Sequence, residues 1–146
     1  MSGRFVAIPL SVMDSVAYAK LKWTARALLV ELAAQFKGHN NGDLSAAYAL
    51  FKPRGWTRST LQTATAELER AGFIVRTRQG GLHQCNLYAL TWRAIDNCSG
   101  KNFDQGLPIG GAPLHLYAKN PSPKFGPHKP EIQAATDEKI AVSATF

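Results

Sequence analysis

The sequence is short of the features on which several classes of protein depend. Its 146 residues include only two cysteines, Cys85 and Cys98, too few for a disulfide scaffold or a zinc finger. No apolar run approaches the roughly 20 residues of a membrane-spanning helix. Asp14 interrupts the apolar N-terminal stretch, so we expect no secretion signal. These absences predict a cytoplasmic protein with reduced thiols and no membrane partner.

Acidic residues are scarce as well. The chain has 10 Asp and Glu against 17 Lys and Arg, which gives a formal net charge of +7. Such a balance favours a polyanionic partner, nucleic acid first and an anionic membrane second. Apolar residues make up 45% of the chain, enough for a hydrophobic core. We therefore expect a folded basic domain.

Proline divides the chain unevenly. Residues 99–146 hold six of the eight prolines, whereas residues 1–98 hold all three tryptophans, and 12 Lys and Arg against 6 Asp and Glu. This predicts a domain over residues 1–98, followed by a Pro/Gly-rich tail, extended or disordered, over residues 99–146. Within the tail, the apolar residues 114–117 are a candidate docking peptide for a protein partner.

Apolar spacing and turn residues predict the elements of the domain. Helices are expected over residues 12–21, 24–36, 46–51 and 57–71, a short strand at 43–44, and longer strands over 73–78 and 84–92. Gln79-Gly80-Gly81 is expected to form the hairpin turn between the two longer strands. The expected fold is mainly α with a small antiparallel sheet, of the α+β class.

Two short motifs carry a resemblance to a known family. Gly55-Trp56-Thr57 precedes the helix 57–71, and Leu68 followed by Gly72-Phe73-Ile74 closes it. This pattern resembles winged helix-turn-helix proteins. The opening Phe5-Val6-Ala7-Ile8-Pro9 and the trailing Tyr88-Ala89-Leu90-Thr91-Trp92 are similar to small bacterial, phage- or plasmid-associated members of that family. The resemblance implies a three-helix core with a two- to three-stranded antiparallel wing. It also implies sequence-specific binding of double-stranded DNA, by a transcriptional regulator or a replication-initiator-type protein of a mobile element, associated with the nucleoid.

The outer face of helix 57–71 is the first candidate site. Leu61, Ala64 and Leu68 share one face at helical spacing, and the opposite face has short polar or basic side chains. Such side chains suit the major groove of DNA, where Arg pairs with guanine and Gln with adenine. The candidate base-reading residues are Arg58, Ser59, Gln62, Thr63 and Arg70. A solvated polar face is the alternative.

Basic residues on either side of this helix are candidate phosphate contacts. Arg76, Arg78 and His83 flank the predicted hairpin turn, and Lys52 and Arg54 precede the helix. Arginines beside a glycine-rich tip can reach phosphates or a minor groove. The alternatives are an edge hairpin kept soluble by its charge and an ordinary solvated loop.

Other conspicuous residues receive structural interpretations. The three tryptophans, Trp23, Trp56 and Trp92, are expected to pack around the core, and Cys85 to be a small buried hydrophobe in a strand. The four histidines lack metal-ligand spacing, and no catalytic or cofactor-binding motif is found. We expect a non-enzyme without metal or cofactor.

The partner remains open between several possibilities. A single winged module makes few phosphate contacts, so a second copy of the chain could complete a longer DNA site. The principal alternative is a winged helix that binds a protein, as a phage- or plasmid-encoded adaptor or inhibitor without DNA binding. RNA binding is a weaker third possibility, because exposed aromatics on a sheet are not evident.

Overall fold

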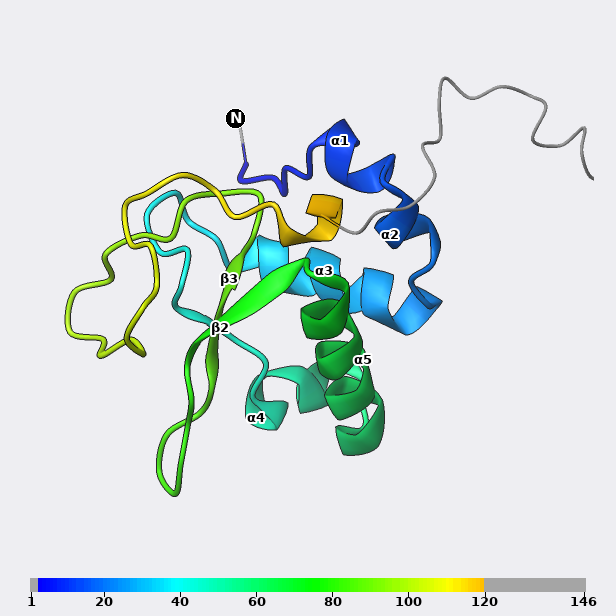
Figure 1. The fold of residues 1–146 in the computed structure, drawn as a ribbon. Coiled ribbons are helices and arrows are strands. Elements are labelled where there is room, and N and C mark those ends of the chain that lie inside the picture. Colours follow the sequence, from blue (N-terminus) through cyan, green and yellow to red (C-terminus); the bar gives the residue numbers. More distant parts are fainter. Residues whose placement is uncertain (1–2, 120–146) are drawn as a thin grey trace, which may run out of the picture.

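The computed structural model describes residues 3–119, in which two long helices are combined with several single turns and a small sheet (Figure 1). The helices are α1 (Leu10–Met13), α2 (Val16–Ala19), α3 (Trp23–Ala34), α4 (Tyr48–Phe51) and α5 (Arg58–Ala71), with 3₁₀ turns η1 (Lys52–Arg54) and η2 (Leu116–Lys119). The predicted helix 12–21 is divided, because Ser15 caps α2 by accepting a hydrogen bond from the backbone N–H of Tyr18 at 3.1 Å.

Three short strands form one antiparallel sheet. They are β1 (Leu44–Ser45), β2 (Ile74–Arg78) and β3 (Leu87–Leu90), in the spatial order β1-β3-β2. The register between β2 and β3 shifts between Arg76 and Arg78, an irregularity of the kind that twists a hairpin. Helices combined with a small antiparallel sheet confirm the predicted α+β class.

The core lies between the two long helices and the sheet. Leu28, Leu29 and Leu32 of α3 are fully buried and belong to the same apolar cluster as Leu61 and Leu68 of α5. The sheet contributes further buried side chains to this cluster: Leu44, Ile74, Tyr88 and Leu90. Burial of one face therefore fixes the rotation of α5 and directs its other face outward.

A buried asparagine ties the turn before β1 to the end of β3. The Asn41 side chain donates hydrogen bonds to the carbonyls of Leu90 and Ala94, at 3.0 and 2.9 Å, and its oxygen accepts one from the N–H of Leu90 at 2.7 Å. Thr77, also buried, donates to the carbonyl of Gly42 at 2.7 Å. Because their polar groups are paired, both side chains can be buried at little cost.

The structure moves the end of the packed domain beyond residue 98. Tyr117 is 5% exposed, and its ring stacks on Phe73 with 5.2 Å between centroids. The N–H of His115 donates to the carbonyl of Thr91 at 2.7 Å. Residues 99–119 therefore pack on the domain, and the expected docking peptide at 114–117 is held by the core at its tyrosine. The rest of the predicted tail, residues 120–146, lies outside the described residues.

Two of the predicted buried residues lie on the surface. Trp23 is 80% exposed at the start of α3, where the guanidinium of Arg26 lies 5.1 Å from its ring centroid. Cys85 is exposed, and it precedes β3, which begins at Leu87, so the thiol lies outside the strand in which it was expected. Trp56 and Trp92 do pack with the core, as predicted.

The hairpin and the first turn of α5 project from the same side of the molecule. In Figure 1 the β2–β3 hairpin extends well beyond the sheet toward the bottom of the view, where α4 and the first turn of α5 also lie. α1 and η2 lie at the opposite end. The hairpin, α4 and the first turn of α5 thus project on one side, whereas the last turn of α5, which holds Arg70, lies at the other end of the helix.

Candidate nucleic-acid interface

α5 presents a polar face to solvent. Its N-cap Thr57 accepts a hydrogen bond from the N–H of Thr60 at 3.3 Å, and Gly72 ends the helix in the left-handed conformation. Leu61, Ala64 and Leu68 are buried. The opposite face consists of exposed residues: Ser59, Gln62, Thr63, Ala66 and Arg70. The structure therefore places four of the five candidate base-reading residues on one accessible stripe, and the fifth, Arg58, is exposed beside it in the first turn of α5.

The two carboxylates of α5 lie beside this stripe and are engaged by other groups. Glu67 accepts a hydrogen bond from the backbone N–H of Lys22 at 2.9 Å. Glu69, on the other flank, forms an ion pair with Arg76 at 3.1 Å. Because both acids are directed to neighbouring elements, part of their negative charge is offset, and the Glu69 side chain stays 32% exposed beside the stripe.

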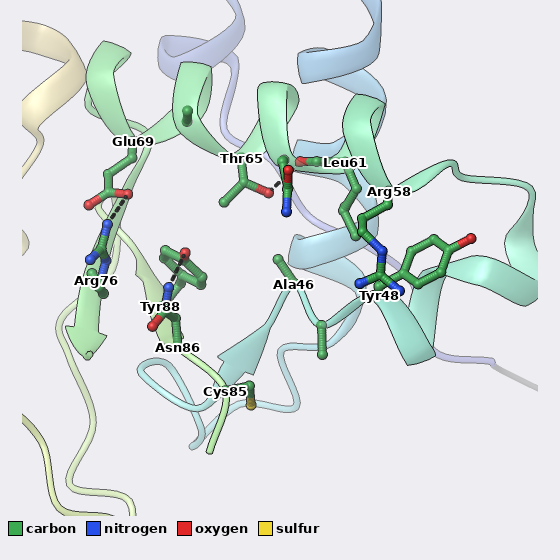
Figure 2. A pocket seen from close by; sticks show the side chains of 13 residues that line it. Ala46, Tyr48, Arg58, Leu61, Thr65, Glu69, Arg76, Cys85, Asn86 and Tyr88 are labelled. Atoms are coloured by element: carbon green, nitrogen blue, oxygen red, sulfur yellow. Dashed lines mark hydrogen bonds and ion pairs between the residues drawn. The ribbon is translucent and has the colours of Figure 1, made fainter. Parts of the chain in front are cut away.

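Arg58 is oriented by an aromatic ring. Its guanidinium carbon lies 4.3 Å from the ring centroid of Tyr48, which belongs to α4, and Figure 2 shows the two side chains side by side at the start of α5. The arginine remains exposed while it is stacked. Stacking leaves the guanidinium edge free to donate hydrogen bonds and restricts its rotamers. Tyr48 is a contributor that the sequence pattern did not indicate.

The link before α5 contributes two cations, an arginine in an ion pair and a lysine with no ion pair among the described residues. Arg54 donates through Nε to Glu31 of α3, so part of its charge is neutralised. Lys52 is exposed and forms no ion pair with any residue in 3–119. Of the two predicted phosphate contacts in this link, Lys52 is the one whose charge is not compensated by the described residues.

The two hairpin arginines flank the turn as expected, and each also makes a contact within the protein. Arg76 is half-buried between Glu69 and Gln79, and its hydrogen bond with the Glu69 carboxylate raises the pKa of the guanidinium above its ordinary value. Arg78 donates to the carbonyl of Cys85 across the hairpin at 3.0 Å. Both side chains therefore brace the base of the hairpin, while His83, at its tip, is exposed.

A hollow of about 360 Å³ separates α5 from the hairpin. Figure 2 shows side chains from both elements around it, with the Glu69–Arg76 pair at one end and Arg58 at the other. Gln62, Asn86 and Cys85 also line it. The hollow places polar groups of α5, α4 and the hairpin around one concave surface beside the exposed stripe.

Other kinds of site were also sought in the described residues. Between residues 3 and 119, no three His, Cys, Asp or Glu side chains are grouped as metal ligands would be. None of the helices in that range has the length and apolar content needed to span a bilayer. Comparison with known proteins gives no match to any protein-family model, curated protein or solved structure.

Proposed function

We propose that this protein binds double-stranded DNA as a winged helix-turn-helix domain. In this proposal α5 enters the major groove, and the β2–β3 hairpin is the wing, lying over the neighbouring backbone or minor groove. The order of elements, α3, β1, α4, α5, β2, β3, is compatible with such a layout. The resemblance of its motifs to mobile-element proteins favours a transcriptional regulator or a replication-initiator-type role.

One observation carries the proposal, the exposed stripe of α5. Ser59, Gln62 and Thr63 are short or amide side chains that both donate and accept hydrogen bonds, as base edges require. The free N–H groups and the positive dipole end of α5 lie at the same end as Arg58 and favour a phosphate there.

The charge distribution supports few phosphate contacts. Arg58 and Lys52 are exposed, whereas Arg54 and Arg76 share their charge with acids. With about two to four phosphates neutralised, the logarithm of the affinity should fall with the logarithm of salt concentration at a slope of about −2 to −4. A single copy would therefore bind modestly, and a palindromic target would indicate that two copies bind together.

The test selects bound sequences from a random duplex pool and then measures binding of the enriched duplex by fluorescence anisotropy. Gln62→Glu adds a negative charge to the stripe without removing a hydrogen bond within residues 3–119, and should weaken binding at least about tenfold. Gln105→Glu makes the same change on an exposed loop after β3 and is the control.

Two results would overturn the proposal. The first is the absence of any enriched sequence together with no binding to random duplex at low salt. The second is equal loss of affinity in Gln62→Glu and Gln105→Glu, which would mean that only net charge matters and that α5 does not read the groove. Thermal unfolding of both variants checks that each is folded.

A further inference from the structure

The tip of the hairpin carries an exposed leucine. Leu82 is 90% exposed, more than any other large apolar side chain in residues 3–119. It occupies a two-residue turn with His83, closed by two backbone hydrogen bonds between Gly81 and Gln84 at 3.0 and 3.3 Å. The turn was predicted at residues 79–81 but is formed by Leu82 and His83, so the hairpin is longer than expected. Its tip therefore carries an apolar side chain.

The tip is held in place by hydrogen bonds below it. The N–H of Gly80 donates to the side-chain oxygen of Asn86 at 2.6 Å, and Arg78 donates to the carbonyl of Cys85 at 3.0 Å. The two chains approach so closely that a Cβ at Gly80 would lie 2.4 Å from the carbonyl oxygen of Gln84. The result is a narrow, braced projection that ends in Leu82.

The surroundings of Leu82 suit an anionic groove. Residues 79–86 contain no carboxylate, and His83 and Gln84 beside it are hydrogen-bonding side chains. The tip projects on the same side as the first turn of α5 (Figure 1). A minor groove about 6 Å wide is too narrow for the two strands but admits the side chain at their tip, and apolar side chains inserted between base pairs there unstack them and bend the duplex.

We infer that Leu82 is a wedge, inserted into the minor groove between two base pairs next to the segment read by α5. This inference rests on the proposed DNA binding and defines the substrate further: a duplex that is bent in the complex. Pyrimidine–purine steps such as TA and CA unstack most easily, so the bound site should carry one where the tip reaches. The leucine then contributes specificity without a hydrogen bond to a base.

The experiment uses the full chain and the enriched duplex in two labelled forms. One form carries a donor and an acceptor dye at its ends to report bending, and the other has 2-aminopurine at successive positions to report unstacking. We expect a bend of at least about 20° and a fluorescence increase at one step. Leu82→Ala should abolish both signals and reduce the preference for TA at that step, with at most a tenfold loss of affinity.

Leu10→Ala is the matched control. Leu10 is 72% exposed on α1, at the end of the molecule away from the hairpin (Figure 1), and its truncation should leave binding, bend and fluorescence unchanged. Leu82→Met, which keeps an apolar wedge, should retain most of the bend. Because Leu82 packs against little, thermal unfolding should be the same for all variants.

The outcomes separate the inference from the proposed function. If the protein binds the duplex but leaves it straight and stacked, or if Leu82→Ala bends it as the wild type does, the wedge is wrong and DNA binding stands. If neither the enriched nor a random duplex is bound, the proposed function fails, and the wedge fails with it.

Discussion

Arginines with the same charge have different uses in this protein, according to their neighbours. Arg58 stacks on Tyr48 and keeps its guanidinium at the surface, whereas Arg76 is drawn to Glu69 and Arg78 to a backbone carbonyl. The sequence pattern shows all three only as cations on or near α5, whereas the structure shows which of them is accessible. The group that each guanidinium contacts thus decides whether it is available to a ligand.

The two cysteines differ in the same way, and their reactivity should follow. Cys85 is exposed, whereas Cys98 is half-buried, and burial, with the nearby carboxylates of Asp43 and Asp96, raises the pKa of its thiol. A raised pKa leaves less reactive thiolate at any pH below it. We expect iodoacetamide to label Cys85 faster than Cys98 at pH 7, as measured by peptide mass spectrometry after short pulses.

The pH dependence provides the check on that cause. As the pH rises through the pKa of Cys98, this thiol becomes fully ionised, and only steric shielding still slows its labelling. The labelling rate of Cys85 divided by that of Cys98 should therefore fall as the pH rises. Single variants Cys85→Ser and Cys98→Ser give each rate separately. Faster labelling of Cys98 at pH 7, or a ratio that grows with pH, would contradict the assignment.

At the scale of elements, α5 is predicted best because its signals are local. A capping threonine, a regular apolar spacing and a closing glycine determine its bounds within one stretch of sequence, and the observed helix begins and ends beside Thr57 and Gly72 as expected. The hairpin is predicted less well. Its turn depends on the register between β2 and β3, which shifts at Arg76 through contacts with residues about ten positions away.

The glycines at the two ends of the link–α5 region allow a paired test. Gly72 and Gly55 both have positive φ, 90° and 93°, but a Cβ at Gly72 would meet the backbone of Leu116 and Tyr117 at 2.7 Å, whereas one at Gly55 has nothing within 4 Å. Gly55→Ala should lower the free energy of unfolding by about 1 kcal/mol, from backbone strain alone.

Gly72→Ala should cost more than about 2 kcal/mol, because the clash with the backbone of η2 adds to the same strain. Urea denaturation followed by far-UV circular dichroism measures both variants. Equal losses would mean that residues 116–117 do not pack against the end of α5, and would contradict the close approach at Gly72.

At the scale of the whole molecule, composition misled the prediction of the domain boundary. The prolines and glycines after residue 98 are typical of a tail, and residues 99–115 do lack helix and strand. Yet a segment with little regular structure can still pack on the core. Here the ring of Tyr117 stacks on that of Phe73, a contact between residues far apart in the sequence, which apolar periodicity cannot predict. The position of the domain boundary depends on this long-range packing and could not be predicted from the local sequence pattern.

Two aromatic substitutions should show whether the loss of stability follows the burial of the ring or its size. Tyr117→Ala removes a ring that is stacked in the core and should lower the free energy of unfolding by about 3 kcal/mol or more. Trp23→Ala removes a larger ring, but one that is mostly exposed, and should cost below about 1 kcal/mol. Thermal and urea unfolding of both variants provide the comparison; a larger loss for Trp23→Ala would place residue 117 outside the core.

The position of η2 at the end of the molecule away from the hairpin has a practical consequence (Figure 1). Ala118, in this turn, is exposed. A biotin or dye coupled there, through Ala118→Cys in a chain whose own thiols are replaced by serine, would anchor the protein to a sensor chip with α5 and Leu82 turned to the flowing solution. Immobilised in this orientation, the molecule can be screened against nucleic acids without the support covering the surface under study.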